Sequence, residues 1–411
     1  MKKFYFFLSV LIIVNGAMAQ WVSQTSGTSN RLSSVYFPNA NTGYIVGSSG
    51  TILKTTNGGT DWESQISGIP NNLTSVYFTD AITGYAVGLY GIILKTVDGG
   101  TNWTSQTSGT NHDLISIYFT APNTGYAVGG NYGVSTILKT TDGGTTWAPQ
   151  NSGIQTSLQN QLKSVYFTDA QTGYIAGQDN QLSGVIIKTT NGGITWTPVN
   201  SGIQYSPLYS LFFTDALTGH AVGYSFSSSG STGVILETAN GGSNWTNQNS
   251  GTSNTLYSVF FTDANTGYVV GSGGTILKTT NGGTNWTPQN SGNSISLNSV
   301  YFTDANTGYA VGDGGTILKT TNGGGYPVGI NYTPSVSGSL KLYPNPTTDK
   351  ITIKNDCEGQ VSILNLSGQE LLQQTITLPN TTVDVSALPR GVYIVKVMGK
   401  RTVQVGKVIK H

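Results

Sequence analysis

Seven copies of one phrase recur along the chain, and they constrain its fold more than any other feature. Each copy reads close to S-V-Y-F-T-D-A-x-T-G-Y-x-V-G, followed by T-I-L-K-T-T-N-G-G-T-x-W. A period of about 40–50 residues with about four short strands per copy is typical of a β-propeller. We therefore expect an all-β chain whose main part is a seven-bladed propeller. The copies open at Ser34, Ser75, Ser116, Ser164, Ser210, Ser258 and Ser299.

The tryptophans indicate how the two ends of the repeat region meet. Six of them follow an N-G-G or D-G-G turn: Trp62, Trp103, Trp147, Trp196, Trp245 and Trp286. Trp21 has no such turn before it, whereas the last turn, at Asn322, has Tyr326 rather than a tryptophan after it. We expect residues 21–27 to supply the missing outer strand of blade seven, which would remove both exposed edges. An open stack with a frayed N-terminus is the alternative.

The turn before each tryptophan resembles the Asp-box, or BNR repeat, pattern S/T-x-D-x-G-x-x-W. Aspartate and asparagine both support a tight turn, but asparagine cannot act as an acid catalyst. We therefore predict a structural role for this position, and likewise for the repeated Asp80, Asp169, Asp215, Asp263 and Asp304. The box position holds Asn57, Asp98, Asp142, Asn191, Asn240, Asn281 and Asn322.

Length variation is confined to one sector of the expected ring. The connection between the second and third strands grows in blades three, four and five, and the connection between blades grows before blades four and five. Because strands alternate in direction, these connections share one face, opposite the box turns. Insertions in repeat proteins often lie on the binding face, although harmless drift is the alternative. The predicted ligand-binding residues are Asn131, Tyr132, Asn160, Gln178, Asp179, Asn180, Tyr205, Tyr224 and Phe226.

Amides and aromatic rings in these insertions suit a glycan or a protein ligand. Nucleic acid is a poor partner for the ring, because 13 acidic residues outnumber 8 basic ones between Gln20 and Tyr326.

We expect no cofactor and no metal: His112 and His220 are isolated, and Asp313 lacks calcium-site spacing. The single cysteine, Cys357, excludes an intramolecular disulfide.

The ends of the chain predict export. Residues 1–19 have the basic, apolar and small-residue order of a signal peptide, and no later segment is long and apolar.

Residues 327–338 read as a linker. Residues 339–411 contain Y-P-N-P, S-x-L-x-x-G-V-Y and a lysine-rich last strand, and they resemble the type A C-terminal sorting domain of the Bacteroidota type IX secretion system. This resemblance implies a small Ig-like β-sandwich, the secretion machinery as a partner, and a ring that is released or anchored at the outer-membrane surface.

The ring itself, residues 20–326, resembles the photosystem II stability/assembly factor-like propellers through S-V-x-F-x-D-x-x-x-G-Y-x-V-G and T-x-N-G-G-x-x-W. That family binds its partner through an arginine patch, and sialidases need three arginines, whereas this ring has only Arg31. We therefore expect a non-catalytic propeller that binds a glycan or protein through blades three to five. The alternative is a secreted glycoside hydrolase that uses a carboxylate pair, with Asp179 and Glu237 as the candidates.

Overall fold

The computed structural model describes residues 21–131, 133–154, 161–179, 181–227, 230–324, 340–354, 359–365, 370–376, 380–399 and 403–411. These residues form two compact units, divided near residue 325. Apart from four short 3₁₀ turns, every regular element among them is a strand, which confirms the all-β prediction. The predicted signal peptide and linker lie outside the described residues, as do Tyr132, Asn160, Asn180, Tyr326 and Cys357.

The described residues up to 324 form seven four-stranded antiparallel sheets, numbered here in chain order. Sheet 1 contains β2 (Leu32–Tyr36), β3 (Gly43–Gly47), β4 (Ile52–Thr55) and β5 (Glu63–Gln65). Sheet 2 contains β6 (Leu73–Phe78), β7 (Gly84–Gly88), β8 (Ile93–Thr96) and β9 (Thr104–Gln106). Sheet 3 contains β10 (Leu114–Ala121), β11 (Thr124–Asn131), β12 (Val134–Thr140) and β13 (Ala148–Pro149). Sheet 4 contains β14 (Gln161–Phe167), β15 (Gly173–Gln178), β16 (Gly184–Thr189) and β17 (Thr197–Val199).

The remaining three sheets repeat this order, with one exception in the last. Sheet 5 contains β18 (Leu208–Phe213), β19 (Gly219–Ser227), β20 (Gly230–Thr238) and β21 (Thr246–Asn249). Sheet 6 contains β22 (Leu256–Phe261), β23 (Gly267–Gly271), β24 (Ile276–Thr279) and β25 (Thr287–Gln289). Sheet 7 contains β26 (Leu297–Phe302), β27 (Gly308–Gly312), β28 (Ile317–Thr320) and, as its outer strand, β1 (Val22–Gln24).

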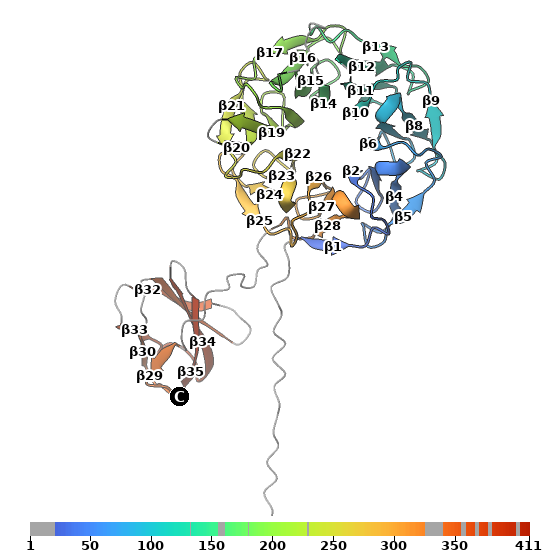
Figure 1. Ribbon diagram of the computed structural model, residues 1–411. Coiled ribbons are helices and arrows are strands. Elements are labelled where there is room, and N and C mark those ends of the chain that lie inside the picture. Colours follow the sequence, from blue (N-terminus) through green and yellow to red (C-terminus); the bar gives the residue numbers. More distant parts are fainter. Residues whose placement is uncertain are drawn as a thin grey trace, which may run out of the picture. The chain divides into compact units, whose positions relative to one another are not determined.

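The sheets stand around a ring, with first strands such as β2, β6 and β10 nearest the centre and last strands such as β5 and β9 at the rim (Figure 1). The repeat serines join neighbouring first strands. Each serine Oγ accepts the N–H of an apolar residue in the next sheet, at 3.2–3.4 Å. The last bond, from Val35 N–H to Ser299 Oγ, joins sheet 7 to sheet 1. The repeated serine therefore links the first strands of all seven sheets into one circle.

The N-terminal strand completes sheet 7. Val22 pairs with Lys319 and Gln24 with Ile317, in an antiparallel register. The Trp21 side chain is 1% exposed, and its ring meets those of Tyr268 and Phe302 edge-on. This is the pairing that the missing tryptophan predicts.

In sheets 3 and 5 the residues inserted between the second and third strands lengthen those strands rather than a loop. β19 and β20 extend to nine residues each, paired down to Ser227 and Gly230, and β11 and β12 are lengthened in the same way. Pairing satisfies the backbone groups that a free loop would leave to water. Where nothing is inserted, a 3₁₀ turn joins the second and third strands: η1 (Ser48–Gly50), η2 (Leu89–Gly91), η3 (Ser272–Gly274) and η4 (Asp313–Gly315).

The second unit is built from two antiparallel sheets. One contains β29 (Lys341–Tyr343), β30 (Lys350–Lys354) and β33 (Asn380–Asp384). The other contains β31 (Gly359–Leu364), β32 (Glu370–Ile376), β34 (Gly391–Gly399) and β35 (Val403–Lys410). Ile351 and Val383 from the first sheet share one buried cluster with Val361 and Val395 from the second. The two sheets therefore pack face to face, as alternating apolar residues require.

Candidate functional site

The Asp-box turns hold their own backbone together. In the turn of sheet 2, Thr96 Oγ1 donates to Asp98 Oδ1 at 2.8 Å and accepts the N–H of Gly100 at 2.9 Å. The same Asp98 oxygen accepts the N–H of Asn102. These hydrogen bonds lower the pKa of Asp98 to about 2. Asn57 makes the equivalent bonds in sheet 1, so the side chain at this position serves the turn whether it is charged or neutral.

The repeated aspartates after the first strand also close turns. Asp80 Oδ1 accepts the N–H groups of Ile82 and Thr83, both at 2.8 Å, and Asp169, Asp215, Asp263 and Asp304 do the same in their own sheets. These turns and the box turns share one face of the ring, because Gly58 N–H bonds Asn41 C=O across them. We call this face the box face. The opposite face, which carries the insertions, is the loop face.

Three of the predicted ligand-binding residues come together on the loop face of sheet 5. The Tyr224 and Phe226 rings meet edge-on with centroids 4.6 Å apart. Phe226 N–H bonds Tyr205 C=O, which anchors the inserted segment before β18 to the lengthened hairpin. Phe226 is 48% exposed and Tyr205 56%. Tyr205 has a φ of +50°, a conformation that non-glycine residues seldom adopt. Aromatic surface is thus held in place above sheet 5.

The other described candidates are more dispersed. Asn131 ends β11 in sheet 3, and its Oδ1 is buried with no hydrogen-bond partner among the described residues. Gln178 ends β15 in sheet 4, opposite Gly184. Asp179 follows Gln178 and turns its carboxylate onto its own loop, where Oδ1 accepts the N–H groups of Gln181 and Ser183. This oxygen therefore supports the turn in which it lies.

Seven further residues lie one position before each repeat serine, and they were not among the predicted site residues. They surround the centre of the ring on the loop face, and we call the cavity that they line the channel mouth. In every first strand the pairing register shifts at this position, so one residue forms a bulge. Bulges re-aim side chains, and here all seven line a cavity of about 380 Å³ on the loop face. The sequence signal for these residues is a variable position between a leucine and a serine that are present in all seven copies. The seven residues are Ser33, Thr74, Ile115, Lys163, Tyr209, Tyr257 and Asn298.

The mouth joins the sheet 5 aromatics to form one surface, which we call the aromatic track: Tyr205, Phe226, Tyr224, Tyr209 and Tyr257. The Tyr209 and Tyr257 rings meet edge-on at 5.6 Å. Burial raises the pKa of Tyr209, and the nearby hydroxyls of Tyr257 and Tyr224 raise it further by smaller amounts. The track therefore runs from exposed rings on sheet 5 to the channel.

Charged groups at the mouth already have partners. Lys163 Nζ donates to Gln161 Oε1 at 2.8 Å, and burial lowers its pKa while Asp113 opposes that shift. Arg31 Nε lies 3.4 Å from Asp313 Oδ1. Because these charges are matched within the ring, the mouth offers mainly neutral polar and aromatic surface.

Deeper in the channel, seven aromatic side chains form a collar. Their rings contact each other around the full circle, with neighbouring centroids 4.9–5.4 Å apart. The five tyrosines each bond the backbone carbonyl of a phenylalanine in the next sheet. The collar narrows the channel below the mouth. Its members are Tyr36, Tyr77, Tyr118, Tyr166, Phe212, Phe260 and Tyr301.

The carboxylate pair considered for hydrolysis is not brought together. Asp179 lies at the loop-face end of sheet 4, whereas Glu237 pairs with His220 beside the box turn of sheet 5. Neighbouring sheets run in the same direction, because Tyr174 at the box end of sheet 4 donates to Gly241 in the box turn of sheet 5. Asp179 and Glu237 therefore lie on opposite faces of the ring. This separation was not apparent from the sequence, because the length of β20 could not be seen there.

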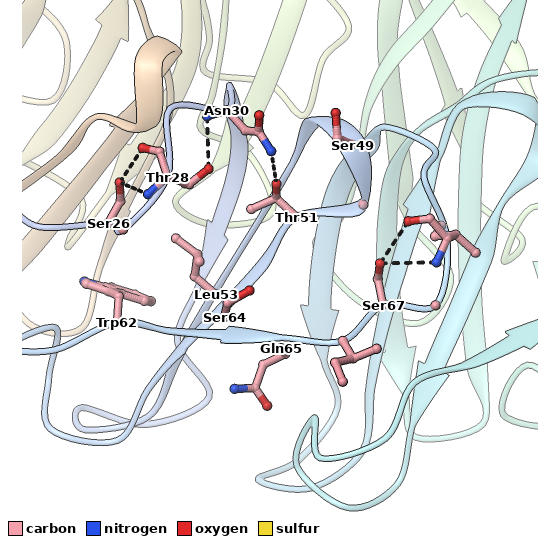
Figure 2. A pocket seen from close by; sticks show the side chains of 15 residues that line it. Ser26, Thr28, Asn30, Ser49, Thr51, Leu53, Trp62, Ser64, Gln65 and Ser67 are labelled. Carbon is pink, nitrogen blue, oxygen red and sulfur yellow. Dashed lines mark hydrogen bonds between the residues drawn. The ribbon is translucent and has the colours of Figure 1, made fainter.

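A second cavity, of about 470 Å³, lies at the rim between sheets 7 and 1 (Figure 2). Its polar groups already bond one another: Ser26 Oγ donates to Thr28 C=O and Ser67 Oγ to Ile69 C=O within their own loops, and Asn30 Nδ2 donates to Thr51 Oγ1 in the neighbouring connection. The same serine bond recurs at Ser108 and Ser291. We interpret this cavity as the groove between successive outer strands of the repeat.

Among the residues that the structure describes, no group of three or more His, Cys, Asp or Glu side chains lies together in a way that could hold a metal ion. No helix among them is long and apolar enough to cross a membrane.

Two family models match the sequence. The model described as photosynthesis system II assembly factor YCF48 matches residues 14–108, 103–252 and 239–342. The model described as secretion system C-terminal sorting domain matches residues 341–411. Comparison with curated proteins finds no match.

Solved structures share the fold. YCF48 bound to D1 peptide is 18% identical, with a TM-score of 0.60 over 74% of this chain and 95% of that chain. YCF48 from Cyanidioschyzon merolae is 18% identical, with a TM-score of 0.61 over 73% and 98%. The Niastella koreensis GH74 enzyme is 15% identical, with a TM-score of 0.59 over 95% and 66%. At these identities the likeness extends to the fold and no further.

Proposed function

Because the chain belongs to the photosynthesis system II assembly factor YCF48 family, we propose that its ring is a non-catalytic binding module. Each four-stranded sheet is one blade of a seven-bladed propeller. The ligand, a glycan or a protein, binds the loop face of blades three to five. There it follows the aromatic track, which runs over blade five to Tyr257 of blade six at the channel mouth. The family resemblance does not supply the partner, because Arg31 is the only arginine in the ring.

The observation that carries this proposal is the continuity of the aromatic track. Tyr205 and Phe226 expose ring surface, and Tyr209 and Tyr257 continue it into a cavity of about 380 Å³. Binding sites are concave and combine aromatic surface with a few polar groups that fix orientation. The positive φ of Tyr205 is also a backbone strain of the kind that occurs at functional sites.

The separation of Asp179 from Glu237 supports a non-catalytic ring over the hydrolase alternative. Glycoside hydrolysis needs two carboxyl groups on either side of one bond, at most about 10 Å apart. Asp179 and Glu237 instead lie on opposite faces. The GH74 structures share the fold, but their activity does not transfer on that ground.

We further propose that the chain is exported through the type IX secretion system and is secreted or held at the outer-membrane surface. The match of residues 341–411 to the sorting domain supports this route. In this proposal residues 1–19 are the signal peptide, 20–326 the propeller, 327–338 the linker, and 339–411 an Ig-like sorting domain that contacts the secretion machinery.

The binding proposal is tested with the chain from Gln20 onward on a polysaccharide panel and on surface extract of the producing cells. We expect retention without release of reducing ends. Tyr224→Ala and Phe226→Ala should each weaken it about tenfold, since a buried aromatic anchor contributes at least 1 kcal/mol. Tyr90→Ala is the matched control, because Tyr90 is 63% exposed on the same face in sheet 2.

Two results would contradict the proposal. Turnover that Asp179→Asn or Glu237→Gln abolishes would establish the hydrolase alternative. Equal loss of retention in Tyr90→Ala and Phe226→Ala would remove the aromatic track as the site.

A further inference from the structure

Six of the seven interfaces between neighbouring sheets share one cationic contact near the box face. The tyrosine of T-G-Y and the lysine of the third strand both donate to the first glycine carbonyl of the next box turn. Tyr44 Oη and Lys54 Nζ, for example, lie 2.7 and 2.6 Å from Gly99 O. The other five pairs bond Gly143, Gly192, Gly241, Gly323 and Gly58 at 2.6–2.8 Å.

The interface between sheets 5 and 6 breaks this pattern at both positions. His220 stands where the tyrosine would be and Glu237 where the lysine would be, and the two residues are directly opposed on β19 and β20. The His220 ring keeps the tyrosine's stacking, lying 4.2 Å from the Phe261 ring, as Tyr44 stacks on Phe78 at 3.9 Å. An ammonium group has therefore been exchanged for a carboxylate without loss of the ring stack.

This exchange leaves the ring nitrogens of His220, one a donor and one an acceptor in the neutral imidazole, without partners. His220 is 0% exposed, and neither nitrogen has a hydrogen-bond partner among the described residues. A Cβ placed on Gly283 would meet His220 at Cε1 (2.8 Å) and Nδ1 (3.2 Å) and Glu237 at Oε2 (3.7 Å), so both side chains reach the same box turn. The preceding residue, Gly282, occupies the position whose carbonyl takes two donors at every other interface, and here both donors are replaced.

We propose that this interface binds a divalent transition-metal cation in place of the lysine ammonium. Imidazole nitrogen and carboxylate oxygen are both ordinary ligands of Zn²⁺ and similar ions. His220 and Glu237 supply the two side-chain ligands, and the Gly282 carbonyl is the third protein group at this position, with water completing the coordination. This proposal differs from the expectation, made from the sequence, that the ring holds no metal. The proposed site has only two His, Cys, Asp or Glu side chains, so it is smaller than the groups of three or more considered above.

The cation reaches the site from the box face. Glu237 is partly exposed there, next to the box turn of sheet 6, while His220 behind it is fully buried. The site is thus on the opposite face from the aromatic track and does not depend on the binding function proposed above. A metal bound there ties the second and third strands of sheet 5 to the box turn of sheet 6, as the lysine and tyrosine do elsewhere.

The test uses the chain from Gln20 onward, without a histidine tag and freed of metal with EDTA. Calorimetric titration with Zn²⁺ should show one site, and saturating Zn²⁺ should raise the melting temperature by about 2–5 °C. Glu237→Gln and His220→Gln should each weaken Zn²⁺ affinity at least tenfold. The double variant His220→Tyr/Glu237→Lys restores the pair found at the other six interfaces, so it should fold, lose the site and show no shift.

His112→Gln is the matched control, because His112 lies in the connection before β10 of sheet 3 and its Nδ1 already contacts Thr136 Oγ1. This variant should bind Zn²⁺ as the parent does. The proposal is overturned if Zn²⁺ does not bind, if the double variant binds it equally well, or if only Ca²⁺, Mg²⁺ or monovalent ions stabilise the parent. The last result would exclude imidazole as a ligand.

Discussion

His220 occupies the buried position at which the other six copies of the repeat carry a tyrosine, so a titratable imidazole replaces a neutral phenol there. Burial lowers its pKa from 6.5 to about 4. Between these values the unfolded chain binds a proton that the folded chain does not, so stability is complete above pH 6.5 and declines as the pH falls toward 4. A pKa shift of this size changes the free energy of unfolding by at most about 3 kcal/mol over this pH range. Burial raises the pKa of Glu237, which has the opposite effect, with stability lost as the pH rises above 4.5.

We therefore predict that His220→Tyr reduces the loss of stability between pH 7 and pH 4.5. The measurement is the free energy of unfolding from urea titrations at both values, in EDTA so that no metal contributes. Both proteins carry Glu237→Gln, so that the carboxyl opposite His220 does not contribute to the pH dependence. Equal pH dependence in the two proteins would mean that His220 is not buried as a neutral base.

At the scale of single elements, the box turn is stabilised by its threonine more than by its aspartate. Thr96 is 2% exposed, and its hydroxyl accepts the N–H of Gly100. Thr96→Val keeps the shape but leaves this N–H buried without a partner, which should lower the free energy of unfolding by about 1–3 kcal/mol. Asp98→Asn should leave the melting temperature near that of the parent, because asparagine occupies the same position in sheet 1.

Thermal melts of Thr96→Val, Asp98→Asn and the unchanged chain decide between these roles. A large loss in Asp98→Asn, with little change in Thr96→Val, would show that the charge matters and the hydroxyl does not.

The repeat made these strands and turns predictable, because fixed spacing of apolar residues and glycines is a local signal. The channel mouth was not predictable in the same way. Leu32, Val35 and Phe37 are all buried, which strict alternation forbids, since Leu32 and Val35 are three residues apart. The bulge at Ser33 resolves this conflict and turns that side chain toward the channel. Its direction depends on the neighbouring strand, which a single sequence does not specify.

The position of Glu237 is a second case of the same kind. Its alignment with six lysines was visible in the sequence, as was the replacement of tyrosine by His220. That the two replacements face each other follows only from the antiparallel register of β19 and β20. Insertions were counted as loops, whereas they lengthened the hairpin and so left Glu237 at the box end.

At the scale of the whole ring, closure depends on a strand from the other end of the sequence. The three residues of β1 pair with β28, and Trp21 fills the position that a box tryptophan occupies in the other sheets. Its ring packs against Tyr268 and Phe302 within a cluster that also contains residues of sheet 6, such as Val270 and Ile276. Loss of this side chain therefore affects sheets 6 and 7, and sheet 7 is the one sheet of the described ring whose four strands are not consecutive in the chain.

We predict that Trp21→Ala lowers the free energy of unfolding by about 3–5 kcal/mol, the range for a buried tryptophan. Trp103→Ala is the matched control, because Trp103 occupies the same position in a sheet formed from continuous chain, and it is buried to a similar degree. If closure by β1 holds the ring together, Trp21→Ala should lose at least as much stability as Trp103→Ala, and proteolysis should begin near residue 21. A loss below about 1 kcal/mol, the size of an ordinary surface change, would mean that the ring is stable without its N-terminal strand.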